Sequence, residues 1–168
     1  MPAHTQIPLD EYLGTDYSPD CDYIDGVLEE RNVGENDHSF AQKQLLLYLS
    51  ARERQWDVYV VQEQRIQVSP SRYRVPDLCV MPGGRPSEQV FSTPPVLCIE
   101  ILSPEDRIAR IQERIDDYLR FGVPTVWLID PASKRGWIYT ADSIAEARDG
   151  VLRAGAGIAV PLAEALAC

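Results

Sequence analysis

Two acidic residues stand where a carboxylate is unusual. Asp77 follows Pro76 and leads into the apolar segment 78–81, and Glu100 lies inside the mostly apolar run PPVLCIEIL. A carboxylate within an apolar strand costs free energy unless a cation or hydrogen bonds satisfy it. Two carboxylates on strands of one sheet can share a Mg²⁺ ion, which prefers oxygen ligands in near-octahedral geometry. Such an ion lowers the pKa of a bound water and holds a phosphodiester for in-line attack.

A structural interpretation of the same pair stays open. Glu100 can pair with an arginine, and Asp77 can cap a turn. Cys79 and Cys98 each lie two residues from one of the acids, so strand alternation predicts that they share a face. We expect them to be small buried residues that lie near each other, with a zinc site shared with the acids as the alternative. The four cysteines are scattered without a CxxC pair, which indicates reduced thiols rather than a structural zinc site.

The elements that must position these acids follow from periodicity and from turn residues. An apolar strand over 96–102 is expected in the middle of a sheet with both faces covered. Asp25-Gly26 predicts a hairpin over 22–32. We expect helices over 7–13, over 37–54 with Asp37 as a cap, and over 104–121 with Gly122 at its end. The other expected strands are 58–61, 65–68, 78–81, 125–129 and 136–140, and the tail 151–168 holds one short strand and a helical turn. This order predicts a mixed α/β fold with one central sheet.

The helix predicted over 104–121 carries three arginines beside its apolar face. At about 100° per residue, that face holds Ile108, Ile111, Ile115, Tyr118 and Leu119. Arg107, Arg110 and Arg114 form a stripe along its margin, and Arg107 and Arg114 lie closest to the face. Either one can therefore reach the strand that holds Glu100. The alternative is a solvated Arg114 that pairs with Glu113 or Asp117.

Several other polar residues are candidates for a supporting role. The stretch 64–76 contains arginines and no acid, which indicates either a phosphate-facing hairpin or an ordinary exposed one. His38 at a helix start either adjoins the site or faces solvent. The weaker candidates are Asp22, Glu29, Glu35, Glu63, Gln64 and Arg85, whereas Trp127, Trp137 and Tyr139 are expected to serve packing.

The ordered segments VPDLCV, PPVLCIEILSPEDR and YLRFGVPTVWLIDP resemble the Uma-type (Uma-two) restriction endonucleases of the PD-(D/E)XK superfamily. The resemblance runs from IPLDEYL through YIDG to the terminal VPLAEAL. It implies a restriction-endonuclease-like α/β fold over one domain, 1–168, with a central mixed sheet flanked by helices. It also implies that Asp77 and Glu100 bind Mg²⁺ or Mn²⁺ and that the substrate is DNA.

The chain departs from the family pattern at the basic position. The superfamily motif has a lysine two residues after the glutamate, where this chain has Leu102. The family resemblance implies that the following helix supplies the lysine instead, and Arg114 stands at that position. Arginine retains the charge that stabilises a phosphoryl transition state, but it cannot transfer a proton. Arg114 is therefore the expected third catalytic residue, and catalysis depends on whether charge alone suffices.

Composition limits the possible functions. The chain has 168 residues with 45% apolar and 25% charged residues, typical of one globular domain. No apolar run spans a membrane and no secretory signal is evident, so a cytoplasmic location is expected. A net charge of −10 argues against avid nonspecific nucleic-acid binding, so a nuclease needs a local basic surface. The hypotheses are a Mg²⁺-dependent DNA endonuclease, a catalytically degenerate binding module of the same fold, or an interaction protein, with a homodimer expected by analogy.

Overall fold

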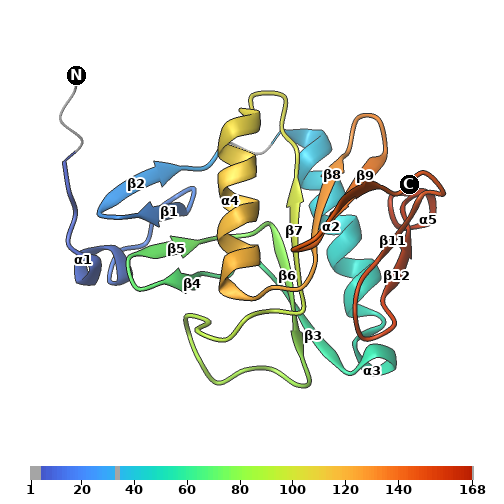
Figure 1. Cartoon of the computed structure of the whole chain (residues 1–168), viewed down its shortest axis with the longest axis horizontal. Helices are drawn as coiled ribbons and strands as arrows, with labels where there is room; N and C mark the ends of the chain where they lie inside the picture. Colours follow the sequence, from blue (N-terminus) through green and yellow to red (C-terminus); the bar gives the residue numbers. More distant parts are fainter. Residues whose placement is uncertain (1–4, 33–34, 168) are drawn as a thin grey trace.

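The structure is a computed structural model that describes residues 5–32 and 35–167. A six-stranded mixed sheet lies at its centre with helices against it (Figure 1). The mixed α/β class predicted from the sequence is confirmed. The helices are α1 (Leu9–Leu13), α2 (Asn36–Ser50), α3 (Glu53–Trp56), α4 (Ile108–Phe121) and α5 (Leu162–Ala165).

The central sheet has the strand order β10-β9-β8-β7-β6-β3. Only β7 and β8 among these strands pair in parallel. All five residues of β7 are buried, as its apolar run predicted. The strands are β3 (Val58–Gln62), β6 (Leu78–Pro82), β7 (Leu97–Ile101), β8 (Val126–Asp130), β9 (Arg135–Tyr139) and β10 (Ile144–Glu146).

Strand alternation divides the core into two layers. Leu78, Val80, Leu97 and Ile99 pack with Leu45 and other residues of α2 on one face of the sheet. The alternate strand residues Cys79, Met81 and Cys98 pack with Ile115 and Tyr118 of α4 on the other face. The helix α4 therefore packs on β6 and β7, next to the two acids. Arg114 of α4 needs this arrangement in order to reach Glu100.

A second sheet, of order β2-β1-β5-β4, was not predicted. Its β1/β2 hairpin turns at Asp25 and Gly26, whose φ angles of 50° and 92° match the predicted turn. The strand that the sequence missed is β5, three residues long with an arginine at each end and therefore without an apolar signature. The strands are β1 (Cys21–Ile24), β2 (Val27–Glu30), β4 (Ile66–Ser69) and β5 (Arg72–Arg74).

Two predicted helices are shorter than expected. The helix predicted over 37–54 is α2 followed by the separate turn α3, and Glu35 rather than Asp37 occupies the N-cap position of α2. The helix predicted from residue 104 begins at Ile108, because Asp106 closes a turn by accepting the Ser103 amide at 2.7 Å. The predicted end of α4 is confirmed at Gly122, whose φ of 108° suits glycine.

The C-terminal segment holds more strand than was predicted. It forms β11 (Val151–Arg153) and β12 (Ala159–Pro161) before α5, and β10 was also missed. Ile108, expected on the apolar face of α4, is the first residue of the helix and is 84% exposed. Within residues 5–32 and 35–167, the helices are too short or too polar to cross a membrane.

Candidate nuclease site

Asp77 stands directly before β6 and lies opposite Glu100 of the adjacent strand β7. The antiparallel register pairs Leu78 of β6 with Ile99 of β7, so the next pair outward is Asp77 and Glu100. Both side chains are buried, and Oδ2 of Asp77 accepts the amide hydrogen of Ile101 at 2.7 Å. The two acids that the sequence singled out are thus adjacent, at the end of the β6/β7 pair.

Arg31 and His38 neutralise Asp77. Oδ1 of Asp77 accepts a hydrogen bond from Nη2 of Arg31 and lies 3.3 Å from Nε2 of His38. Burial opposes ionisation of Asp77, but Arg31, His38 and the Ile101 amide outweigh it and hold the pKa of Asp77 below its usual value. The pKa of His38 is raised, because the hydrogen bond to Asp77 and its charge outweigh burial of the imidazole. Asp77 is therefore ionised at neutral pH.

Glu100 has a different environment on the α4 side of the sheet. Its Oε1 accepts a hydrogen bond from the Tyr118 hydroxyl at 2.7 Å, and its Oε2 accepts one from Nη1 of Arg114 at 3.1 Å. Burial raises the pKa of Glu100 to about 7, with a further increase from nearby Asp77, although Arg114 opposes the shift. Glu100 therefore titrates near neutral pH, where the neighbouring Asp77 stays charged.

Arg114 connects Glu100 to the second sheet. Its Nε lies 3.3 Å from Oδ2 of Asp22, a fully buried residue of β1. Its partners are thus Glu100 and Asp22, and the alternative pairing with Glu113 or Asp117 is wrong. The prediction that Arg114 reaches the Glu100 strand is confirmed.

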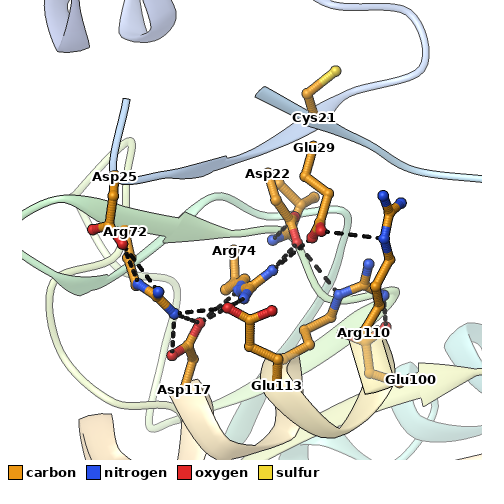
Figure 2. A network of polar contacts seen from close by, with 12 residues as sticks. Cys21, Asp22, Asp25, Glu29, Arg72, Arg74, Glu100, Arg110, Glu113 and Asp117 are labelled. Atoms are coloured by element: carbon orange, nitrogen blue, oxygen red, sulfur yellow. Dashed lines mark hydrogen bonds and ion pairs between the residues drawn. The ribbon is translucent and has the colours of Figure 1, made fainter. Parts of the chain in front are cut away.

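The arginines of the segment 64–76 are neutralised by acids from other parts of the chain. Arg74 is fully buried and binds Asp22, Glu29 and Asp117 (Figure 2). Arg72 binds Asp25 and Asp117, and Arg65 binds Asp20. The interpretation of this segment as a phosphate-facing hairpin is therefore wrong, because its guanidinium groups are bound by acids of the protein itself.

A cleft of about 580 Å³ opens beside Asp77. The basic residues that line it are Arg31, His38, Arg107, Arg110 and Arg114, and acids such as Glu30, Glu105 and Asp106 line it as well. Asn32 donates a hydrogen bond to Asp106 at 2.7 Å and so links β2 to the loop before α4. Glu100 is not among the lining residues, because Arg114 and Tyr118 cover its carboxylate. A ligand in the cleft therefore meets Asp77 and the arginines before it meets Glu100.

The remaining candidates divide between the cleft and other surfaces. Glu63 lines the cleft and lies 3.3 Å from Gln42, whereas Glu35 is exposed outside it. Gln64 donates to the carbonyl groups of Arg65 and Gln89 and adjoins Arg85 in a separate small pocket. Trp127 is a core residue whose Nε1 donates to the Arg153 carbonyl, in agreement with a packing role.

Cys79 and Cys98 are buried together in the core. Cys79 faces Cys98 directly across β6 and β7 and both are fully buried, as expected. Burial raises the pKa of both thiols, so they stay protonated. Over the residues that the structure describes, no group of three or more His, Cys, Asp and Glu side chains can hold a metal ion.

The donor chemistry of the acid pair fits a Mg²⁺ ion bound by two carboxylates. In proteins this ion is commonly held by one or two carboxylates, with water and substrate phosphate completing its shell. Each carboxylate oxygen can accept more than one bond, so the existing hydrogen bonds leave acceptor capacity. Oδ1 of Asp77 faces two protein donors, so an ion approaching from the cleft meets Arg31 and His38 there.

Sequence reasoning missed three residues of the site. Arg31 follows β2 and has no periodic pattern around it, so nothing in the sequence connects it with Asp77. Gln42, whose amide donates to the Asp77 carbonyl at 3.1 Å, is likewise linked only by the fold. Tyr118 was assigned to the apolar face of α4. Its position four residues after Arg114 is a signal that could have joined it to Glu100.

Comparison with known proteins identifies the family and a protein of similar fold. The Uma2 family model, described as "Putative restriction endonuclease", matches residues 9–163. A crystal structure described as "a putative nuclease belonging to DUF820" from Anabaena variabilis superposes with a TM-score of 0.81 at 22% identity, covering 95% of this chain and 97% of that one. None of the curated proteins matches. Because the family model covers nearly the whole chain, the protein belongs to the Uma2 family.

Proposed function

We propose that this protein is a divalent-metal-dependent endonuclease that hydrolyses phosphodiester bonds of DNA. Membership of the Uma2 family supports a nuclease-like function. The observation that carries the proposal is the buried Asp77–Glu100 pair, with Arg114 bound to Glu100 at the edge of a cleft. Carboxylates with perturbed pKa values at or beside a cleft, as Asp77 and Glu100 are, are typical of catalytic sites.

Each residue has a proposed role. Asp77 and Glu100 hold the ion, which when bound supplies an activated water and charge stabilisation for phosphoryl transfer. The Ile101 amide and Tyr118 orient the two carboxylates. Arg114 is positively charged at any working pH and stabilises charge on the phosphate without moving a proton.

A degenerate binding module is the second candidate. Leu102 occupies the position of the superfamily lysine, which favours loss of catalysis. Each oxygen of Asp77 and Glu100 also faces a donor of the protein itself, so the acids are satisfied without an ion. Cleavage of DNA separates the two candidates.

Metal binding is tested by calorimetry with Mn²⁺. The wild type is expected to bind one ion and the double variant Asp77→Ala, Glu100→Ala to bind none, because both proposed ligands are gone. Thermal melts of each apo protein establish that the variant is folded. Equal Mn²⁺ binding by the wild type and the double variant would contradict the proposed site.

Catalysis is tested by nicking of supercoiled plasmid with Mn²⁺ or Mg²⁺. Slow cleavage is expected from the wild type, faster cleavage from Arg114→Lys, and a loss of roughly 10²–10³-fold in Arg114→Ala, the usual cost of removing one stabiliser of transition-state charge. Arg120→Ala is the matched control, since Arg120 is 73% exposed on the same helix and pairs with Asp117. Absence of cleavage in both the wild type and Arg114→Lys would favour the binding module.

A further inference from the structure

Arg31 holds the carboxylate oxygen that an incoming cation would meet first. Its side chain is 12% exposed at the cleft, and Nη2 binds Oδ1 of Asp77. The other oxygen, Oδ2, accepts the backbone amide of Ile101 in β7. That amide belongs to a buried strand and cannot move away from Oδ2. Oδ1 is therefore the oxygen at which an ion can replace a side-chain donor of the protein.

Arg31 is held less firmly than the other buried arginines. Over the described residues, Asp77 is the one acceptor of a hydrogen bond from the Arg31 side chain. Arg114 has two carboxylate partners, Glu100 and Asp22, and Arg74 is held by several acids. Withdrawal of Arg31 therefore breaks a single ion pair, whereas withdrawal of Arg114 breaks two.

We propose that Arg31 competes with the divalent ion for Oδ1 of Asp77 and thereby sets the metal concentration at which the site fills. The inference rests on the proposed function, since it takes Asp77 as a metal ligand. A guanidinium on Oδ1 balances the buried charge of Asp77 when no ion is bound, and a divalent ion replaces that charge when it binds. The apparent affinity for metal is lowered by the fraction of molecules in which Arg31 occupies the carboxylate.

His38 does not provide the same competition. Its Nε2 lies 3.3 Å from Oδ1, whereas Nη2 of Arg31 makes a closer contact and donates a hydrogen bond to that oxygen. Arg110 does not provide it either, because its closest carboxylate is Glu29 at 3.6 Å and its side chain is 54% exposed. Arg110 is thus a matched arginine in the same cleft that leaves Asp77 untouched.

The test measures Mn²⁺ affinity by calorimetry for the wild type, Arg31→Met and Arg110→Met. Removal of the competitor is expected to lower the Kd of Arg31→Met about tenfold, equivalent to about 1.4 kcal/mol. Arg110→Met removes the same charge from the cleft at a distance, so its Kd is expected to stay close to that of the wild type. Without metal, Arg31→Met is expected to melt at a lower temperature, and excess Mn²⁺ should raise its Tm more than that of the wild type.

Each outcome bears on the inference. A tenfold lower Kd in Arg31→Met, or binding by that variant alone, supports it. If Arg31→Met lacks a cooperative melt, Arg31→Gln carries the same expectation, since the amide is neutral and can still donate to Asp77. Binding by the wild type with an equal or higher Kd in the Arg31 variant overturns the inference and leaves the proposed function intact. Absence of Mn²⁺ binding by the wild type and both variants overturns the metal site itself.

Discussion

Asp77 and Glu100 are chemically similar, yet their surroundings move their pKa values in opposite directions. Both are buried, which by itself disfavours the charged form. Arg31 and His38 compensate for burial at Asp77, whereas the charge of Asp77 adds to the effect of burial at Glu100. Asp77 is thus ionised at neutral pH. Glu100 exchanges a proton near neutral pH unless a bound cation takes the place of that proton.

The raised pKa of Glu100 predicts a pH-dependent stability. Protonated Glu100 is favoured in the folded state over the unfolded state, so its protonation stabilises the fold. This contribution to the unfolding free energy is fully present below the usual pKa of 4.5 and is lost as the pH rises through about 7. The variant Glu100→Gln has no carboxyl at this position and therefore does not lose this stabilisation as the pH rises. Between pH 4.5 and pH 8 without metal, the wild type should therefore lose about 3 kcal/mol of unfolding free energy relative to Glu100→Gln.

Urea denaturation at pH 4.5 and pH 8 measures this difference. Glu105→Gln is the control, because Glu105 is exposed at the rim of the same cleft. A gap between the wild type and Glu100→Gln that stays constant with pH would show that Glu100 does not exchange a proton in this range. A large loss of stability in Glu100→Gln at both pH values would show that Glu100 holds a structural ion pair with Arg114.

At the scale of elements, buried ion pairs join the second sheet to α4. Arg74 at the end of β5 binds Asp22 of β1 and Asp117 of α4, and its side chain is fully buried (Figure 2). Removal of one partner from such a network leaves buried charges without compensation, which typically costs 3–5 kcal/mol. The network therefore positions Asp22, and through it Arg114, relative to the cleft.

Arg74→Met is expected to lower the unfolding free energy by about 3–5 kcal/mol, because Asp22 and Asp117 lose their shared partner. Arg72→Met is the matched comparison on the same strand. Its side chain is 25% exposed, its partner Asp25 is 54% exposed, and the buried Asp117 keeps Arg74, so a loss of about 1 kcal/mol is expected. Urea denaturation of both variants gives the two values, and equal losses would show that burial of Arg74 adds nothing.

At the scale of the whole molecule, a net charge of −10 opposes DNA binding except where arginines gather. The arginines of 64–76 are neutralised internally, and Arg107 and Arg110 share the cleft lining with acids that include Glu30, Glu105 and Asp106. The proposed nuclease should therefore bind DNA weakly, with an affinity that falls as salt increases.

The double variant Arg107→Gln, Arg110→Gln is expected to reduce the slope of log K against log salt by about 2, since each phosphate contact contributes about 1. Fluorescence anisotropy of a labelled duplex across a salt series measures the slope. Arg148→Gln is the control, because Arg148 is 87% exposed and does not line the cleft. An unchanged slope in the double variant would place the DNA elsewhere on the protein.

Several elements of the fold could be predicted from the local sequence. The apolar run around Glu100 indicated a buried strand, Gly122 marked the end of α4, and Asp25-Gly26 marked the hairpin. These signals are local because strand burial, helix termination and tight turns depend on a few consecutive residues. The order of the family's motifs then identified Asp77 and Glu100 as a pair, and the antiparallel register brings them together.

Only the tertiary structure decided which charges meet. Arg31 and Asp77 are 46 residues apart, and Arg74 and Asp117 are 43 apart, so no sequence pattern couples them. In the sequence, the segment 64–76 is a basic stretch without acids, yet acids from β1, β2 and α4 neutralise its arginines. The sequence by itself determined the fold class, the family and the acid pair, because these depend on local patterns and ordered motifs. The structure decided that Arg31 covers Asp77 and that Arg114 bridges two sheets, because an ion pair depends on the spatial distance between side chains and not on their separation along the chain.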